Sequence, residues 1–175
     1  MSEKSAIKRQ EGFPYFTVLC FLYQKSAKFM NKIQFLVIHH SASGTKTTLK
    51  QIDAWHKARE FPKSSLGFYV GYHYVIGDGW IKQTRAWKDI GAHAREKGMN
   101  FKSIGICLTG NFLYDKPSEY QKKELVKLLV GLMAEFKLGE NKILRHGDVS
   151  NTACPGKITV KDIQSWVRKY HKWKH

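Results

Sequence analysis

Histidine and cysteine side chains stand where strands are expected to end, in positions suited to metal chemistry. His39 and His40 follow an apolar run, and His93 lies in a Gly-Ala-His-Ala segment. His146 follows another short apolar run, and Cys154 comes eight residues after it. Imidazole and thiolate are ligands that Zn²⁺ prefers, and three of them with an open fourth position make a catalytic site. Spacing alone also leaves an ordinary polar role open for each histidine.

Other chemical motifs are missing from the sequence. There is no H-E-x-x-H helix motif, no paired C-x-x-C and no glycine-rich phosphate loop, because the glycines at 77 and 79 read as a hairpin turn. Zinc-finger spacing and an RNA-binding aromatic motif are missing too, so no nucleic acid is expected as a partner. These absences favour an open catalytic metal site over a helix-borne metalloprotease or a structural zinc site.

The elements that must position these residues alternate along the chain. Short runs rich in β-forming residues predict strands at 34–38, 72–76, 80–84, 104–108 and 142–145. Helical spacing predicts a helix over 48–60, and capping-box signals at Ser118 and Thr159 predict two more. We therefore expect one mixed α/β domain, with a sheet of about five or six strands flanked by helices.

Composition limits the class of protein and the kind of partner. The chain has 175 residues, of which 42% are hydrophobic and 13% aromatic, so it can form one folded core. No apolar run reaches the roughly 18 residues of a membrane-spanning helix, and three cysteines are too few for a disulfide scaffold. The net charge of +16 favours a polyanionic partner such as an anionic cell wall or membrane.

Residues 1–30 differ from the rest and are treated as an N-terminal extension to a domain over 31–175. A basic start precedes an apolar run at 13–23, which outlines a secretory signal but contains Pro14. The alternatives are an interfacial anchor, an extra strand, or an upstream extension of a protein that starts at Met30.

Several segments together carry a resemblance to a known family. The matching strings, in chain order, are VIHHSAS at 37–43, IDAWH at 52–56, GYHYVI at 71–76, GAHA at 91–94, SIGICLTGN at 103–111, and the segment from His146 through ACPG at 153–156. With these strings the chain resembles the zinc-dependent N-acetylmuramoyl-L-alanine amidases of the amidase_2, or peptidoglycan-recognition, type. Short phage amidase-type lysozymes are the nearest in pattern. The resemblance implies that family's single-domain α/β fold and peptidoglycan as the substrate.

The resemblance implies a zinc ligand set, residue by residue. His39, His146 and Cys154 occupy the family's three ligand positions. His40 should point away, because adjacent residues of a strand face opposite sides. Relatives that lack the cysteine bind peptidoglycan without cutting it, so Cys154 favours an enzyme that hydrolyses the bond between N-acetylmuramic acid and L-alanine.

Two further residues match catalytic positions of the family. Tyr72 matches the tyrosine that assists next to the metal-bound water. Thr152 stands where some phage members have a lysine, and threonine brings no cationic charge to an oxyanion. The resemblance therefore leaves the division of labour between these two residues open.

Three residues match substrate-contact positions. His93 corresponds to a residue that lines the cleft, and Asn100 to the asparagine of a Gly-x-Asn motif. Arg85, in Arg-Ala-Trp, resembles an arginine that pairs with the extra carboxylate of meso-diaminopimelate, and a solvated arginine is the alternative. The resemblance thus favours peptidoglycan of the diaminopimelate type.

The setting of the activity is expected from the same family. We expect a monomer that acts as an endolysin or wall-remodelling enzyme, with weak contact to an anionic wall or membrane through its basic surface. Such an enzyme stays in the cytoplasm until lysis releases it to the wall, or is secreted to the periplasm if residues 1–29 act as a signal. A non-catalytic peptidoglycan-binding module is the alternative function.

Overall fold

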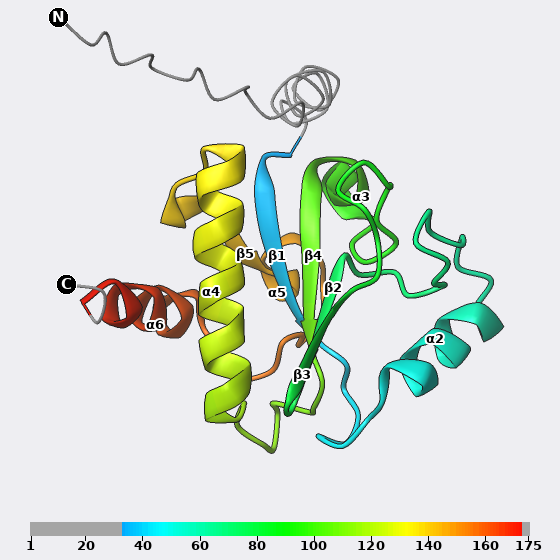
Figure 1. Ribbon diagram of the computed structural model, residues 1–175, viewed down its shortest axis with the longest axis horizontal. Coiled ribbons are helices and arrows are strands. Elements are labelled where there is room, and N and C mark those ends of the chain that lie inside the picture. The colour runs from blue at the N-terminus through cyan, green and yellow to red at the C-terminus, as the bar shows by residue number, and fades with distance from the viewer. Residues whose placement is uncertain (1–32, 173–175) are drawn as a thin grey trace, which may run out of the picture.

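A five-stranded sheet forms the centre of the protein, as a computed structural model describing residues 33–172 shows (Figure 1). The strand order is β3-β2-β4-β1-β5. The strands are β1 Phe35–His40, β2 Tyr74–Gly77, β3 Trp80–Gln83, β4 Ser103–Leu108 and β5 Ile143–Arg145. Strand β3 is antiparallel to β2, whereas the other neighbours are parallel. The mixed sheet predicted from the sequence is confirmed.

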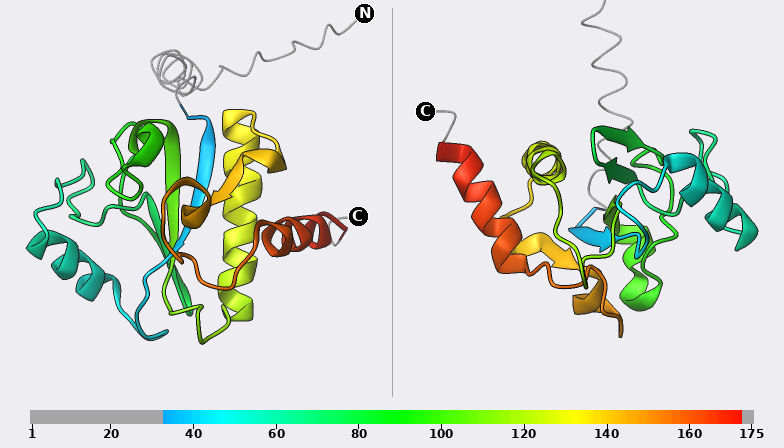
Figure 2. Two further views of the ribbon diagram at one scale, coloured as in Figure 1. Left: turned by 180° about the vertical axis from the view of Figure 1, so that it is seen from behind. Right: turned by 90° about the horizontal axis from the view of Figure 1, so that it is seen from below.

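Helices lie on both sides of this sheet. They are α2 Leu49–Ala58, α3 Met99–Lys102, α4 Glu119–Phe136, α5 His146–Val149 and α6 Val160–Lys172, with 3-10 turns at Glu96–Gly98 and Glu140–Lys142. Helix α4 runs along one face with α6 packed beside it, and α2 lies on the far side of the molecule (Figure 2). The site residues described below lie on the face turned away from α4.

Strand β1 separates the apolar core from this second face through the alternation of its side chains. Leu36 and Ile38 are fully buried and pack in a cluster with Leu125 and Leu129 of α4. His39, between Ile38 and the last strand residue, therefore points to the opposite face. One strand thus anchors the core with alternate residues and presents a functional side chain with the others.

Local sequence signals explain where the long helices begin. Thr48 and Ser118 each accept a hydrogen bond from the backbone N–H of a glutamine three residues on, which closes a capping box. The predicted hairpin also forms, although β2 begins at Tyr74 rather than at residue 72. Helices α3 and α5 have four residues each, too few for a periodic pattern to predict.

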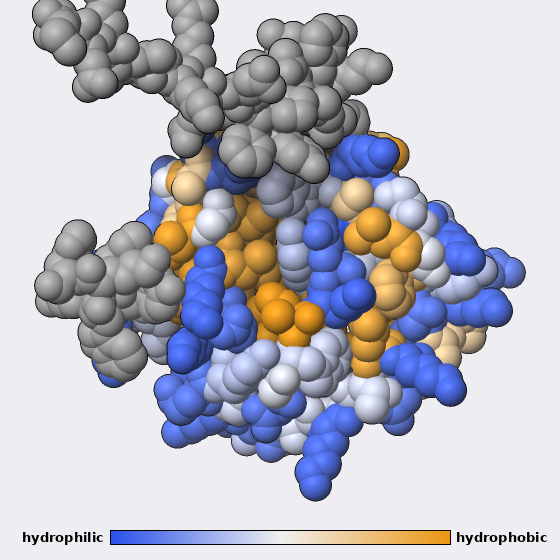
Figure 3. All heavy atoms as spheres, in the orientation of Figure 1, coloured by the Kyte–Doolittle hydropathy of each residue, from blue (hydrophilic) through white to orange (hydrophobic). Residues whose placement is uncertain are grey.

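Apolar residues are mostly hidden inside this fold. Figure 3 shows hydrophilic residues over most of one face, with apolar residues in narrow areas between them. Among residues 33–172, no helix is both long enough and apolar enough to cross a membrane. The predicted N-terminal extension over residues 1–30 lies outside the described range.

Candidate metal centre

Three predicted ligands converge at the carboxyl end of β1. The ligand atoms of His39, His146 and Cys154 all lie within 4.8 Å of one another. The Nδ1 atom of His39 is 3.9 Å from the Cys154 Sγ, and the rings of His39 and His146 have centroids 4.5 Å apart. They come from a strand, a short helix and a loop that are far apart in the sequence.

His39 is held in place because β1 is flanked by strands on both sides. Its Cα pairs with that of Cys107 in β4, and β5 pairs with β1 up to Ile38. The next residue, His40, points to the other face, where its Nδ1 accepts the backbone N–H of Phe112 at 3.1 Å. Of the adjacent histidines, only His39 therefore faces the candidate ligands.

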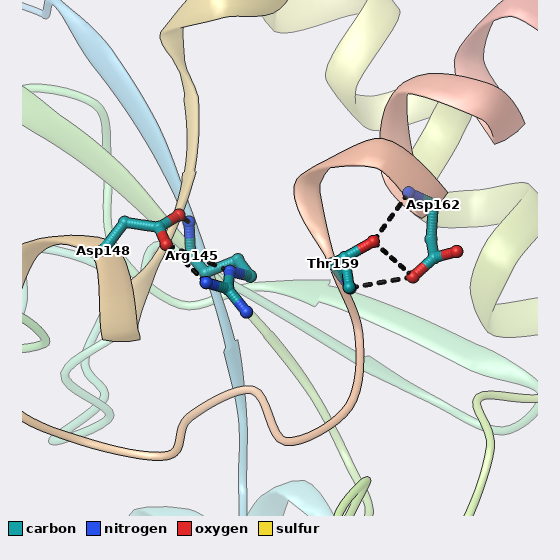
Figure 4. A network of polar contacts seen from close by, with 4 residues as sticks. All are labelled: Arg145, Asp148, Thr159 and Asp162. Carbon is teal, nitrogen blue, oxygen red and sulfur yellow. Dashed lines mark hydrogen bonds and ion pairs between the residues drawn. The ribbon is translucent and has the colours of Figure 1, made fainter.

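His146 is placed by the short helix that it begins. Arg145 precedes the helix, and its backbone N–H donates to Asp148 Oδ2 at 2.8 Å while its guanidinium contacts the other carboxylate oxygen at 2.6 Å (Figure 4). Figure 4 also shows the equivalent contact of Thr159 with Asp162 at the start of α6. The ion pair at the first turn of α5 fixes the direction in which His146 leaves the strand.

Cys154 belongs to a loop tied to β1 and to the segment after β4. The backbone N–H of His40 donates to its Sγ at 3.3 Å, and its own N–H donates to the exposed Thr152 Oγ1 at 3.3 Å. Gly156 has φ +73° and leaves no room for a side chain against the backbone of Phe112. Burial raises the pKa of the Cys154 thiol to about 11, partly offset by the His40 N–H.

Tyr72 lies beside this cluster, just before β2. Its ring centroid is 5.0 Å from that of His39 and 5.4 Å from that of His56. Burial raises the pKa of its hydroxyl well above the ordinary value, and the sulfur atoms of Cys107 and Cys154 add to the effect. Tyr72 is therefore a neutral phenol at physiological pH, able to donate and accept hydrogen bonds.

His93 and Asn100 lie close to the first ligand and bond to the protein itself. His93 is buried, and its Nδ1 is 3.0 Å from the Nε2 of His39. The side-chain oxygen of Asn100 accepts the backbone N–H groups of His93 and Ala94, each at 2.8 Å. The structure thus gives both residues partners inside the protein, and their predicted contacts with substrate stay predictions.

Arg85 is also turned into the protein. It is 2% exposed, and its Nε donates to the Val70 carbonyl at 2.7 Å. Its terminal nitrogens donate to the carbonyls of Ile90 at 3.1 Å and Pro62 at 2.5 Å. The guanidinium thus bonds three backbone carbonyls and holds separate loop segments together, whereas its predicted pairing with a diaminopimelate carboxylate stays a prediction.

The electrostatics of the cluster suit ligation of a cation. Burial lowers the pKa of His39 and of His93 well below the ordinary value, and the neighbouring histidines lower it further for His39. Burial also lowers the pKa of His146. All three rings are neutral at physiological pH, and a neutral imidazole has the free lone pair that a metal needs.

The donor set fits zinc in chemistry and in scale. Ligand atoms at the usual Zn–N and Zn–S distances of roughly 2.0–2.3 Å lie roughly 3.5 Å apart in a tetrahedral site, close to the 3.9 Å between His39 and Cys154. The Nε2 of His39, on the side of the ring away from Cys154, contacts the Nδ1 of His93, and the Cys154 Sγ accepts the His40 N–H. Hydrogen bonds of this kind orient the ligands of a metal. Two histidines and one cysteine would hold zinc with a fourth position open.

Comparison with known proteins identifies the family. A family model described as N-acetylmuramoyl-L-alanine amidase matches residues 29–157. The chain belongs to this amidase family. The resemblance inferred from the strings of the sequence is thereby confirmed, and the three converging residues lie within the matched range.

Relatives of this chain include both endolysins and recognition proteins. The endolysin of Enterobacteria phage T3 is 32% identical over 159 residues, covering 80% of the chain and 94% of the endolysin. Peptidoglycan-recognition protein SC1a of Drosophila melanogaster is 33% identical over 140 residues, covering 78% and 75%. The family thus joins proteins named for lysis with proteins named for recognition.

Solved structures show the same fold. The endolysin amidase LysCS from Clostridium intestinale matches with a TM-score of 0.68 and 29% identity, covering 80% of this chain and 86% of that chain. A mutant of Drosophila PGRP-LB in complex with tracheal cytotoxin matches with a TM-score of 0.62 and 27% identity, covering 78% and 82%. The mixed α/β fold is therefore shared across both groups.

Two residues near the ligands escaped the sequence reasoning. Ser103 begins β4 and lies against the ring of His93, with the two side chains 3.5 Å apart. Gly105 leaves the space that the same ring fills, since a methyl group there would collide with it. Both belong to the SIGICL string, whose pattern of β-formers indicated only a buried strand.

Proposed function

We propose that this protein is a zinc-dependent amidase that hydrolyses the bond between N-acetylmuramic acid and L-alanine in peptidoglycan. The observation that carries the proposal is the convergence of His39, His146 and Cys154 beside Tyr72. Family membership supports the bond class, and the endolysins among the relatives support cell-wall degradation. A module that only binds peptidoglycan needs no such set of neutral donors.

Hydrolysis of an amide needs a polarised carbonyl and a donor that stabilises the negative charge developing on its oxygen. His39, His146 and Cys154 would hold a zinc ion, which would supply polarisation of the amide carbonyl and activation of a water molecule. Tyr72, a neutral phenol next to His39, would donate a hydrogen bond to the oxygen on which negative charge develops. One such donor is typically worth about 10²–10³ in rate. Thr152 orients the Cys154 loop and contributes no charge.

Zinc binding requires that each ligand atom be free of its proton. The Cys154 thiol must lose its proton to ligate, and the His40 N–H stays directed at the resulting sulfur charge. His39 and His146 need lose none, because burial already keeps both neutral. Binding of a divalent cation therefore releases one proton, which comes from the Cys154 thiol.

Digestion of purified peptidoglycan tests the proposal. The zinc-loaded protein is incubated with diaminopimelate-type and lysine-type material, and the products are analysed by mass spectrometry. We expect free stem peptides that begin with L-alanine from the unmodified protein and none from Cys154→Ser. Cys154→Asp serves as the matched variant, because aspartate can replace the thiolate as a ligand, and it should bind zinc more tightly than the serine variant.

A lack of cleavage by the zinc-loaded protein would contradict the proposal. Intact glycopeptides from both substrates, with one zinc bound per chain, would leave peptidoglycan binding as the function. We further propose that the enzyme is made in the cytoplasm and reaches the wall at lysis. Fractionation of cells that express the full chain, beside cells that express a variant starting at Met30, tests this, since export of the full chain alone would make residues 1–29 a signal.

A further inference from the structure

The imidazole behind the first ligand is buried and specifically oriented. The Nδ1 of His93 lies 3.0 Å from the Nε2 of His39, and the two rings meet nearly at right angles, with an interplanar angle of 85°. This is a hydrogen-bond distance, so one ring must donate and the other accept. The ring that donates determines which nitrogen of His39 keeps a lone pair available to a metal.

Ser103 offers an acceptor beside the Nε2 of His93. Its hydroxyl donates to the Met99 carbonyl at 2.7 Å, so the oxygen presents a lone pair to the Nε2 of His93, 3.5 Å away. An acceptor at this end favours a proton on Nε2 of His93, and a neutral imidazole carries only one proton.

The proton on His39 follows from this assignment. Since Nε2 of His93 holds its only proton, Nδ1 of His93 is an acceptor, and Nε2 of His39 must donate to it. The Nδ1 of His39 then keeps its lone pair. This is the nitrogen that faces the Cys154 sulfur at 3.9 Å.

We propose that His93, with its proton held by Ser103, is a positioning residue that fixes the tautomer of His39 and presents Nδ1 to the metal. The proposal rests on the zinc site proposed above. His93 touches neither substrate nor metal and acts only through the ligand.

The surrounding backbone is shaped for a histidine at this position. Glycine at 91 and at 105 leaves space for the ring, because a methyl group at either residue would collide with it. Asn100 holds the backbone N–H groups of His93 and Ala94 at 2.8 Å, which fixes the direction of the side chain. A residue that served only to fill space would not need polar partners at its two ring nitrogens, as His93 has in His39 and Ser103.

A pair of isosteric variants separates positioning from packing. His93→Asn keeps an acceptor where Nδ1 stood, whereas His93→Leu has the same shape without it. Zinc affinity is measured by competition with a chromogenic chelator, and thermal unfolding checks the fold of both. We expect His93→Leu to bind zinc about 10–100-fold more weakly, with His93→Asn close to the unmodified protein. Equal weakening in both folded variants would overturn the proposal.

A second readout is independent of zinc and of activity. Nitrogen NMR of the imidazole rings in the metal-free protein reports which nitrogen carries each proton. We expect His39 protonated on Nε2 in the unmodified protein and a mixture of tautomers in His93→Leu. Protonation of His39 on Nδ1 in the unmodified protein would refute the tautomer assignment. Absence of zinc binding with the expected tautomer would refute the proposed function instead.

Discussion

The replacement of Arg85 by lysine tests whether this residue holds the fold or reads the substrate. The guanidinium donates to the carbonyls of Val70, Ile90 and Pro62, and the side chain is almost fully buried. Lysine keeps the charge but has a single ammonium in place of a planar fork. It can satisfy one of the three carbonyls with good geometry.

The expected loss follows from the two carbonyls left without a donor. A hydrogen bond from a charged donor contributes about 1.5–3 kcal/mol, so Arg85→Lys should destabilise the domain by about 3–6 kcal/mol. In a domain of this size, 1 kcal/mol shifts the unfolding temperature by roughly 2–4 °C. The midpoint should therefore fall by about 6 °C or more.

Calorimetry and substrate digestion together decide the outcome. Thermal unfolding is measured for the unmodified protein, for Arg85→Lys and for Arg95→Lys, which changes an exposed arginine in the same stretch of chain. The ratio of cleavage of diaminopimelate-type to lysine-type peptidoglycan is measured below all midpoints. We expect a lower midpoint for Arg85→Lys alone and an unchanged ratio. An unchanged midpoint with a reduced ratio would show that Arg85 contacts the stem peptide.

Three other perturbations have defined outcomes. Zinc affinity, measured by chelator competition, should rise about tenfold per pH unit between about pH 7 and 9, because the pKa of Cys154 is about 11 and binding releases its proton. Burial lowers the pKa of His56 and His73 to about 4, so the unfolded chain binds more protons between about pH 6.5 and 4. Stability is full above that window and should fall by roughly 3 kcal/mol per histidine across it, as denaturant midpoints would show. Gly105→Ala should lower the thermal midpoint and weaken zinc binding, because the new methyl group meets the His93 ring; an unchanged midpoint would contradict the packing described.

The sequence predicted the parts of the fold that depend on short-range patterns. Alternation of side chains along β1 correctly separated His39 from His40, since a strand turns successive residues to opposite faces. The capping box of Ser118 with Gln121 likewise marked the start of α4. Local geometry decides these features, so a single segment contains enough information.

Residues whose role depends on distant segments were harder to predict. Arg85, His93 and Asn100 stand in strings that resemble substrate-contact positions, yet their polar atoms bond to the protein itself. The backbone carbonyls around Arg85 belong to segments up to 23 residues away. Nothing in the types of these residues distinguishes an inward from an outward direction, which only the packing of the loops determines.

The order of the three ligands along the chain has a consequence for synthesis. His39 and Cys154 are separated by 115 positions and meet only when β1 lies between β4 and β5. A growing chain that has not yet reached residue 154 therefore holds an incomplete ligand set, however well its sheet has begun to form. If the protein has the activity proposed above, that activity can appear only after residue 154 has been made and its loop has packed against β1. The proposed hydrolase would therefore stay inactive until almost the whole chain has been synthesised.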